Sequence, residues 1–376
     1  MDFSFTEEQT LLRNSVQRFI QDNYDFDSRQ KIVHSDSGWN PDHWKAFAEL
    51  GLLAAPFAEQ YGGFGGGPVE TMIVMEEFGR GLVVEPYLQT VILCGGLIDA
   101  AGSEKQKADL LPKIAGGELV LACAYAEPQG RYNLADLTTR AEKSGDGYVL
   151  NGQKAVVIGA PWADKLIVSA RTGGNQRDAD GVSLFIVDKG ADGVSTRDYP
   201  TVDGQRASEI KFENVAIAAD ALLGTEGQGL SVLEAAIDRA IAGLCAEAVG
   251  CMRVLTDATV EYCKTRKQFG QPIGNFQVLQ HRMVDMFMEC EQSLSMTYMV
   301  NLKLDEGEAE RVKAASSAKA QIGKSGRFVG QQAVQLHGGM GMTDELNVGH
   351  YFKRLTMIDS QFGNVDYHLR RFAAAS

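Results

Sequence analysis

Two stretches of the sequence carry residues whose types and spacing suit the binding of a phosphate-bearing ligand. The first, CKTRKQFGQPIGNFQ at 263–277, gathers Lys264, Arg266 and Lys267 ahead of an aromatic residue and a glycine, in an acidic chain. The second, QLHGGMGMTDE at 335–345, places three glycines within four residues. An arginine fork matches phosphate geometry, an aromatic ring can stack on a ring system, and glycines let a backbone approach a ligand closely. Taken alone, a solvated loop or an ordinary helix cap explains each stretch equally well.

Other common catalytic and metal-binding signatures do not occur in the sequence. There is no GxSxG elbow, no HExxH pair and no zinc spacing. The GKS at 323–325 lacks the glycine that a phosphate loop needs five residues earlier, where Ala318 stands. YGGFGGGP at 61–68 fails the dinucleotide-binding spacing at Pro68, and we interpret it as a connector. The six cysteines form no CxxC pair, so we expect reduced core residues and no metal site.

Composition limits the class of protein. A chain of 376 residues can bury a large core and suggests two or three domains. With 44% apolar and 23% charged residues, the chain has the composition of a globular protein. A formal charge of −13 argues against a nucleic-acid or anionic-membrane partner. Apolar runs are too short to cross a bilayer, and the N-terminus lacks a basic region followed by an apolar core, so we expect a cytoplasmic protein.

The period of the apolar residues is helical in the first third and alternating in the middle. Thr6 with Gln9 forms a capping box ahead of one helix, and PDHWKAFAELG at 41–51 predicts a second. From about residue 119, short β-rich runs such as DKLIVSAR, VSLFIVD and SEIKFENV are separated by turn residues. Asn151-Gly152 predicts a β-hairpin. The middle therefore indicates an antiparallel sheet and argues against a Rossmann nicotinamide site.

The last third is helical again and has the pattern of a bundle. One apolar stripe runs along a first long helix, at Leu233, Ile237, Ile241, Leu244, Ala248, Cys251 and Leu255. Two further stripes follow, at Leu279, Met283, Met286 and Cys290, and at Ile322, Val329, Ala333 and Leu336. We therefore predict an α+β protein with an N-terminal helical domain at 1–118, a middle antiparallel β domain at 119–225 and a C-terminal four-helix bundle at 226–376.

Four segments in this order resemble the acyl-CoA dehydrogenase family across the whole chain. They are GSEKQKADLLPKIAGGELVLACAYAEP, FENVAIAADALLGTEGQG, TRKQFGQPIGNFQ and QLHGGMGMTDE. AEPQGRYNLADL and GHYFKRLTMIDSQFGNVDYHLRRF resemble most the small subunit of pimeloyl-CoA dehydrogenase and related two-subunit enzymes.

The resemblance implies an FAD-dependent reaction. In this family a carboxylate takes a proton from the α carbon of an acyl-CoA thioester while the β hydrogen leaves as hydride to the flavin, which gives a trans-2-enoyl-CoA. The resemblance also implies a homotetramer or a heterotetramer with a larger subunit, and an electron-transfer flavoprotein as the electron acceptor. The acyl group itself cannot be inferred from the sequence.

The two glycine-bearing stretches match family motifs for FAD binding across a subunit boundary. Arg-x-x-Phe-Gly matches RKQFG, which implies Arg266 as a ligand of the FAD pyrophosphate, Phe269 as packing near the adenosine part, and Gln268 within the same motif. Gln-x-x-Gly-Gly-x-Gly matches Gln335, Gly338, Gly339 and Gly341 on the same side.

The flavin side of the chain's own β domain departs from the family pattern. Glu127 is kept from the family's Thr-Glu-Pro, but Ala126 replaces the threonine, and Arg131 is a candidate for a replacement phosphate contact. Val156 and Ile158 stand where a tryptophan and a threonine normally cover the isoalloxazine. These losses remove hydroxyls that would bond the ring, and much of its cover.

The catalytic base is displaced as well. Phe362 stands where the family usually carries its glutamate. A minority branch places that glutamate on the first bundle helix just before an arginine, which here implies Asp238 as the base, with Arg239 beside it on the substrate side. Asp238 borders an apolar stripe, where desolvation favours a usable base, although a salt-bridged aspartate on an exposed edge is the plain alternative. Asp359 and Asp366 are weaker candidates.

The resemblance, together with these departures from it, leaves three functions open. The chain is a subunit of an acyl-CoA dehydrogenase whose larger partner holds most of the flavin and of the chemistry, or a self-sufficient homotetramer that uses Asp238, or a scaffold on the same fold that no longer turns over substrate. An acyl-CoA oxidase-like flavoenzyme is a further alternative.

Overall fold

The computed structural model describes residues 4–375, and the chain divides into two units. One unit comprises the chain up to Lys31, Pro68–Val83 and the chain from Ile241 onwards; the other comprises Ile32–Gly67 and Val84–Ala240. The first is helical and the second carries a sheet with helices, so the predicted α+β class is confirmed. Each unit is made of segments that are separated along the chain, so this division does not test the predicted domain boundaries at 118 and 225, which stay a prediction.

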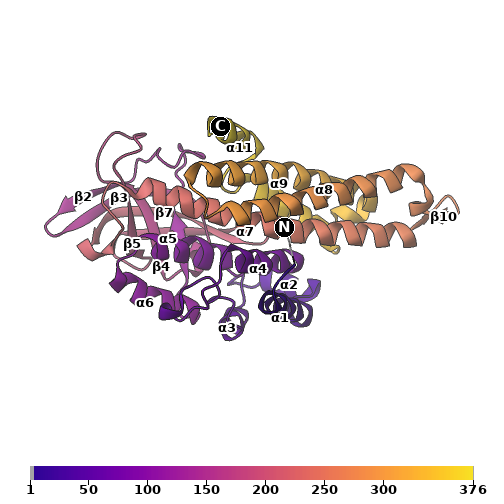
Figure 1. Cartoon of the computed structure of the whole chain (residues 1–376), viewed down its shortest axis with the longest axis horizontal. Coiled ribbons are helices and arrows are strands. Elements are labelled where there is room, and N and C mark those ends of the chain that lie inside the picture. Colours follow the sequence, from indigo (N-terminus) through magenta and orange to yellow (C-terminus); the bar gives the residue numbers. More distant parts are fainter. Residues whose placement is uncertain (1–3, 376) are drawn as a thin grey trace. The chain divides into compact units, whose positions relative to one another are not determined.

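The helical unit is built on long helices that lie side by side (Figure 1). Its helices are α1 (Glu7–Asn23), most of α2 (Phe26–Val33), α4 (Pro68–Gly81), the larger part of α7 (Gly229–Thr265), α8 (Gln277–Lys303), α9 (Glu308–His337), α10 (Asn347–Ser360) and α11 (Val365–Ala374). The predicted capping box starts α1, since the Thr6 hydroxyl accepts from the Gln9 N–H at 3.1 Å and the Gln9 amide oxygen accepts from the Thr6 N–H at 3.1 Å. All seven residues of the predicted α7 stripe are buried, as expected.

Glycines bring α4 and α7 into backbone contact. A Cβ on Gly79 would lie 2.0 Å from the Glu247 carbonyl oxygen, and one on Gly250 would lie 2.0 Å from the Glu76 carbonyl oxygen. Neither position can hold a larger residue without moving a helix. Because the two clashes are reciprocal, the crossing of these helices is fixed at both glycines.

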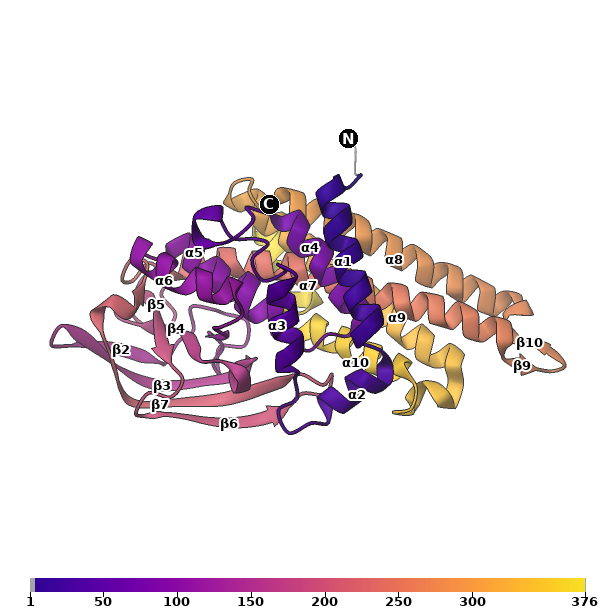
Figure 2. The same ribbon diagram turned by 90° about the horizontal axis from the view of Figure 1, so that it is seen from below.

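The second unit contains an eight-stranded sheet (Figure 2). Its strands follow the order β6 (Val194–Pro200), β7 (Arg206–Ile217), β3 (Gly147–Ile158), β2 (Arg140–Ser144), β4 (Lys165–Arg171), β5 (Val182–Asp188) and β8 (Leu222–Leu223), with β1 (Leu121–Ala124) paired to β4. Its helices are α3 (Pro41–Glu49), η2 (Leu88–Gly95), α5 (Gly96–Ala101) and α6 (Glu104–Ala115), joined by short 3₁₀ turns, and the first twelve residues of α7 belong here. The predicted strands are present, but β1 and β2 pair with β4 in parallel, so the sheet is not purely antiparallel.

The hairpin predicted at Asn151-Gly152 is wrong. Both residues lie inside β3, at a register shift against β7, and the β2–β3 turn falls instead at Gly145-Asp146, between the paired Ser144 and Gly147. Asn151 uses its side chain to accept from the Asn214 N–H at 2.8 Å, and a Cβ on Gly152 would lie 2.4 Å from the Thr139 hydroxyl oxygen. Asn151-Gly152 therefore forms part of a β-bulge, and Gly152 allows Thr139 to approach the backbone closely. Both features favour the residue types that also favour a tight turn.

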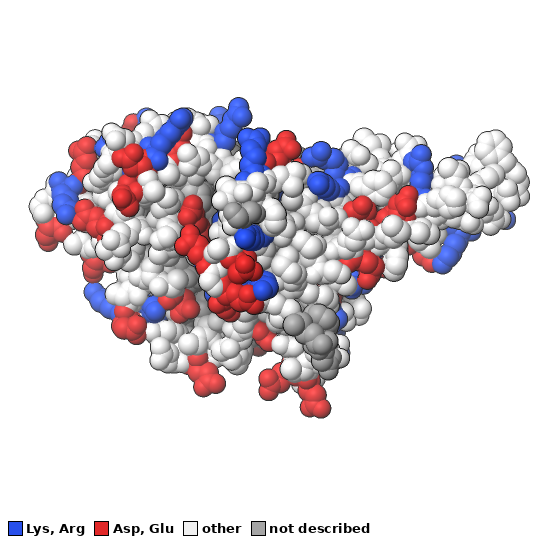
Figure 3. Space-filling model, turned by 45° about the horizontal axis from the view of Figure 1, so that its top comes forward, with Lys and Arg blue, Asp and Glu red and all other residues white. Residues whose placement is uncertain are grey.

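The six cysteines are free and buried, as the sequence predicted. No three His, Cys, Asp or Glu side chains within residues 4–375 are grouped so that they could hold a metal ion. Across the same residues, none of the helices combines the length and the apolar character needed to span a bilayer. On the face drawn in Figure 3, acidic and basic side chains are interspersed.

Candidate functional site

The stretch around Arg266 forms a short hairpin at the end of α7. The Arg266 N–H donates to the Tyr262 carbonyl at 2.9 Å, and the Ile273 N–H donates to the Arg266 carbonyl at 2.8 Å. Strands β9 (Lys267–Gln268) and β10 (Gln271–Pro272) pair between these bonds. The base of the hairpin is thus tied to the helix, while the Arg266 and Gln268 side chains are exposed.

The tip of the hairpin is an exposed aromatic residue in an unusual conformation. Phe269 and Gly270 both have positive φ, at 53° and 82°, as in a type I′ turn. Such a φ is easy for glycine and strained for phenylalanine. Phe269 is nevertheless 91% exposed, with the Phe276 ring 6.1 Å away between centroids. An apolar side chain held out into solvent on a strained turn is a candidate contact for a ligand or a second subunit.

The glycine-rich stretch ends α9 with an open backbone turn. Gly338 has φ 62° and its N–H bonds the Gln335 carbonyl, and the 3₁₀ turn η6 (Gly338–Met342) follows. A Cβ on Gly338 or Gly339 would meet nothing within 4 Å, whereas one on Gly341 would lie 2.9 Å from the Val334 carbonyl oxygen. The first two glycines therefore leave space in front of the backbone, and the third allows the turn to close.

These two features lie at the same end of the helical unit. Tyr262, on the last turn of α7, stacks on His337, the last residue of α9, with ring centroids 4.4 Å apart and planes 28° apart. Its hydroxyl donates to the His337 carbonyl at 3.4 Å. Arg266 follows Tyr262 by one helical turn and Gly338 follows His337 directly. The structure thus brings together two motifs that are separated by some seventy residues in the chain.

In the sheet unit, the kept Glu127 is a buried anchor. Its carboxylate accepts five hydrogen bonds, from the Lys154 ammonium at 2.8 Å, from the Thr138 N–H and hydroxyl, from the Thr139 N–H and from the Gln129 amide. Burial raises its pKa, but the Lys154 charge and the donated bonds outweigh burial and lower the pKa of Glu127 to about 2. The carboxylate is therefore ionised, and its hydrogen bonds hold the backbone around it in place.

The segment after Glu127 is held from several sides. Buried Arg171 donates to the carbonyls of Ala135 and Asp178 at 2.7 and 2.8 Å, and Asp136 binds Arg177 at 2.8 Å. Arg131 lies in the turn that follows Glu127, exposed and with φ 48°. Its guanidinium therefore faces solvent from a rigid support.

Strand β3, which carries Val156 and Ile158, has a bulge. Val156 has φ 52°, which is a true outlier for a β-branched residue, and it is 50% exposed. It lies at the register shift between Lys154 and Val157, and Ile158 pairs with Ala207 beyond it. Neither Val156 nor Ile158 offers a side-chain hydrogen bond, and this matches the departure seen in the sequence.

Asp238 is fully buried on α7, with 0% of its surface exposed, and Arg239 is half-buried beside it. Both side chains interact with other groups of the protein. The exposed-edge alternative for Asp238 is therefore excluded. A fully buried carboxylate in an apolar stripe agrees with a base that needs shielding from water, and equally with a structural aspartate.

The other two aspartates do not have this character. Asp359 binds Arg327 at 2.8 Å, and Asp366 is exposed in the first turn of α11. Phe362, which the resemblance places at the usual position of the base, is buried with φ 59°.

Two buried polar residues that sequence reasoning missed hold the loop around Phe362. The Lys319 ammonium donates to the carbonyls of Asp359 at 2.9 Å and Gly363 at 2.6 Å, and the His368 ring bonds the Phe362 carbonyl at 3.0 Å. Burial lowers the pKa of His368 most, and the nearby positive charges of Lys319 and Arg371 lower it further, to about 3. The His368 ring is therefore neutral. The loop between α10 and α11 is therefore fixed by three bonds to its backbone.

The Lys319 ammonium makes unfolding depend on pH in the alkaline range. Burial lowers its pKa to about 8, against the opposing influence of Cys245 and Asp359, while an unfolded lysine titrates at about 10.4. Between these values the unfolded chain binds more protons, so stability rises with pH, by about 3 kcal/mol in all. Denaturant unfolding at about pH 8 and about pH 10 is expected to show a larger rise in the wild type than in Lys319→Met, where buried Lys154, whose pKa is also lowered to about 8, still contributes. Equal slopes for the two proteins would contradict the assignment.

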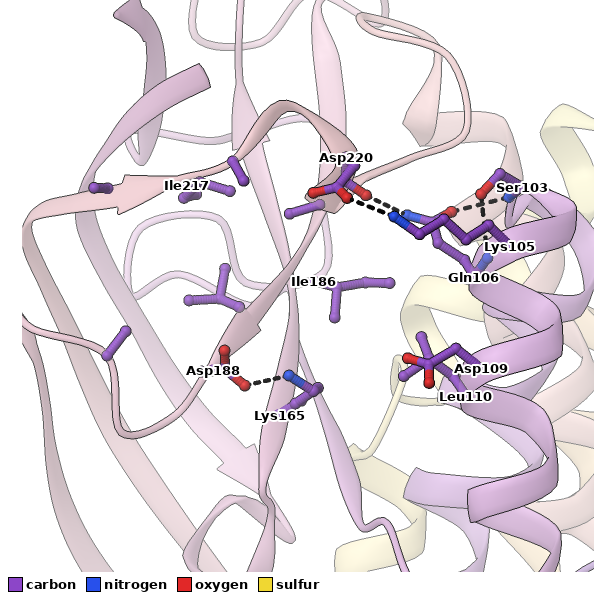
Figure 4. A pocket seen from close by; sticks show the side chains of 15 residues that line it. Ser103, Lys105, Gln106, Asp109, Leu110, Lys165, Ile186, Asp188, Ile217 and Asp220 are labelled. Atoms are coloured by element: carbon purple, nitrogen blue, oxygen red, sulfur yellow. Dashed lines mark hydrogen bonds and ion pairs between the residues drawn. The ribbon is translucent and has the colours of Figure 1, made fainter. Parts of the chain in front are cut away.

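One cavity of the sheet unit is lined by none of these residues (Figure 4). It measures about 470 Å³ between α6 and the strands β4, β5 and β7. Lys105 binds Asp220 at 3.1 Å at one end, and Lys165 binds Asp188 at the other. No residue predicted to bind cofactor or substrate lines it.

The resemblance implies FAD. The residues at the end of the helical unit fit this cofactor better than the residues of the sheet unit do. At the end of the helical unit, the open glycine turn and the exposed guanidinium of Arg266 suit a diphosphate. In the sheet unit, Ala126, Val156 and Ile158 lack the hydroxyl and indole groups that would hold the flavin ring.

Comparison with known families gives matches over nearly the whole chain. The acyl-CoA dehydrogenase N-terminal domain matches residues 6–118, the middle domain 122–215 and the C-terminal domain 227–376. Isovaleryl-CoA dehydrogenase of Pongo abelii is 33% identical over 355 residues, which cover 93% of this chain and 84% of the relative.

Solved structures agree with these matches. The FAD complex of PigA is 28% identical with a TM-score of 0.92, and the match covers 100% of this chain and 98% of that one. The Tcur3481-Tcur3483 steroid ACAD is 29% identical with a TM-score of 0.88, and the match covers 98% and 97%. The predicted fold is confirmed, and the chain belongs to the acyl-CoA dehydrogenase family.

Proposed function

We propose that this chain is a subunit of an FAD-dependent acyl-CoA dehydrogenase, an oxidoreductase that converts an acyl-CoA thioester to its trans-2-enoyl-CoA. The observation that carries the proposal is the pairing of Arg266 and the Gly338–Gly341 turn at one exposed end of the helical unit, through Tyr262 and His337. Both features face outward, as a diphosphate shared with a neighbouring subunit requires.

The chain's own residues would divide the binding of the cofactor as follows. Arg266 would hold the diphosphate, the glycine turn with Gln335 would face it, and Phe269 with Gln268 would lie near the adenosine part in the neighbouring subunit. Glu127 would shape the backbone behind the ring, and Arg131 would supply a second phosphate contact. When bound, FAD accepts the β hydrogen as hydride.

The partner is proposed to be a larger acyl-CoA dehydrogenase subunit, as in two-subunit enzymes of the pimeloyl-CoA dehydrogenase type. Three departures support this: Phe362 in the usual place of the base, and Val156 and Ile158 where the flavin cover should be. The two-protein name of the related Tcur3481-Tcur3483 steroid ACAD is consistent with such an assembly. An electron-transfer flavoprotein would reoxidise the flavin.

A self-sufficient homotetramer is the second candidate, and one observation favours it. Asp238 is a fully buried carboxylate beside Arg239 on α7. Here Asp238 would take the α proton of the acyl-CoA, and Arg239 would bind the substrate. The scaffold and the oxidase-like alternatives have no observation of their own in the structure.

Purification separates these proposals. Expressed alone, the chain is expected to be colourless, and co-expressed with the larger subunit that it pairs with, it is expected to elute as one yellow complex that oxidises acyl-CoA with an artificial acceptor. Flavin absorbance per protomer and subunit stoichiometry measure both results. A yellow, active homotetramer would overturn the two-subunit proposal in favour of the second candidate, and a complex that never retains FAD would overturn both.

A further inference from the structure

We propose that Tyr262 and His337 are positioning residues that hold the Arg266 hairpin and the Gly338–Gly341 turn at a fixed spacing, so that the two can grip one diphosphate. This inference rests on the proposed function. Neither residue belongs to the matched motifs' ligand positions, and neither needs to touch the cofactor.

The first half of the argument concerns the hairpin. An exposed arginine on a free loop would sample many positions and lose entropy on binding. Arg266 instead has both backbone groups bonded, its N–H to the Tyr262 carbonyl at 2.9 Å and its carbonyl to the Ile273 N–H at 2.8 Å. The position of the hairpin therefore follows that of the Tyr262 turn of α7.

The second half concerns the glycine turn. His337 is 4% exposed, and its Nδ1 donates to the Ala333 carbonyl at 2.8 Å, which fixes the ring orientation in the neutral tautomer. A Cβ on Gly341 would lie 3.1 Å from the His337 Cβ, so the turn folds directly against this residue. The position of the turn therefore follows that of His337.

The stacked pair joins the two halves. Rings 4.4 Å apart and 28° from parallel resist sliding, and the hydroxyl bond of 3.4 Å to the His337 carbonyl adds a weaker restraint. Loss of the stack would let the ends of α7 and α9 move independently. Since a displacement of about 1 Å can be costly at a preorganised site, the expected result is weaker cofactor binding in a folded protein.

The test measures FAD affinity in the assembled enzyme, by flavin fluorescence after reconstitution of the apoprotein. Tyr262→Leu and His337→Ala each remove the stack and are expected to raise the Kd for FAD about tenfold, whereas Tyr262→Phe keeps it and is expected to stay within about twofold. Arg266→Ala, which removes the guanidinium itself, is expected to raise the Kd about 10- to 100-fold.

A matched variant separates positioning from general loosening. Tyr298 is a half-buried tyrosine on α8 of the same unit, so Tyr298→Leu is expected to lower the Tm with the FAD Kd unchanged. Two results would overturn the inference and leave the proposed function standing. The first is that Tyr298→Leu raises the Kd for FAD as much as Tyr262→Leu does. The second is that Tyr262→Leu and His337→Ala both bind FAD with wild-type affinity while Arg266→Ala binds it weakly. Wild-type affinity for Arg266→Ala would overturn the proposed function.

Discussion

Replacing Lys154 with methionine is expected to lower the free energy of unfolding by about 3–5 kcal/mol, because the change leaves a carboxylate buried without its charge partner. Both side chains of the Lys154–Glu127 pair are 0% exposed, and the two atoms lie 2.8 Å apart. Lys154 also donates to the Ser169 hydroxyl at 3.1 Å, so its loss frees a second buried group. Urea unfolding followed by circular dichroism measures the effect.

Two variants serve as controls for this prediction. The double variant Glu127→Gln with Lys154→Met removes both charges and is expected to lose less stability than Lys154→Met alone. Lys105→Met breaks an ion pair with Asp220 in which both side chains are largely exposed, and it is expected to leave the midpoint almost unchanged. If Lys154→Met is as stable as Lys105→Met, the Lys154–Glu127 pair does not stabilise the sheet unit.

Acid unfolding gives an independent readout of the same pair. The folded pKa of Glu127, about 2, lies below the unfolded value of about 4.3, so its contribution is present above about pH 4.3 and is lost as the pH falls toward 2. Without Lys154, the pKa of Glu127 is expected to rise, because burial then lacks its main opponent. The loss of stability that Glu127 causes between about pH 4.3 and about pH 2 should therefore be smaller in Lys154→Met than in the wild type.

Helix ends and apolar stripes could be predicted because they depend on local chemistry. The capping box of Thr6 and Gln9 closes within one turn, and the stripe along α7 follows from a period of 3.6 residues. The same reasoning failed at Asn151-Gly152, since a glycine needed for close approach to Thr139 has the same sequence appearance as one needed for a turn. Parallel pairing of β1 and β2 with β4 is a long-range choice that no local pattern encodes.

For the candidate site, the sequence identified motifs but not their supports. Arg266 and the glycines at 338–341 stood out by residue type, whereas Tyr262 and His337 look like ordinary helix residues. Lys319 could have been found: it lies three residues before Ile322, at the next step back along the predicted α9 stripe, and it is buried there. A lysine in an apolar stripe must find acceptors, and here these are backbone carbonyls that appear only when the loop folds over it.

Asp238→Asn is expected to lower kcat by two to four powers of ten in a homo-oligomer of this chain, which is the range for the loss of a general base. The substitution is isosteric and keeps a polar group in a site that is 0% exposed. Steady-state oxidation of acyl-CoA, with flavin content measured in the same sample, separates loss of chemistry from loss of cofactor. Asp366→Asn, at an exposed position on α11, is the matched control and should keep wild-type kcat.

The same pair of variants distinguishes the two candidate assemblies. In a heteromer whose larger subunit supplies the base, Asp238→Asn should leave kcat within about twofold, because the reacting carboxylate lies on the other chain. In a homo-oligomer, full activity of Asp238→Asn would exclude this aspartate as the base. Asp238→Glu adds a further distinction, since a base one methylene longer should retain partial activity, whereas a purely structural aspartate would lose stability from overpacking with no specific effect on kcat.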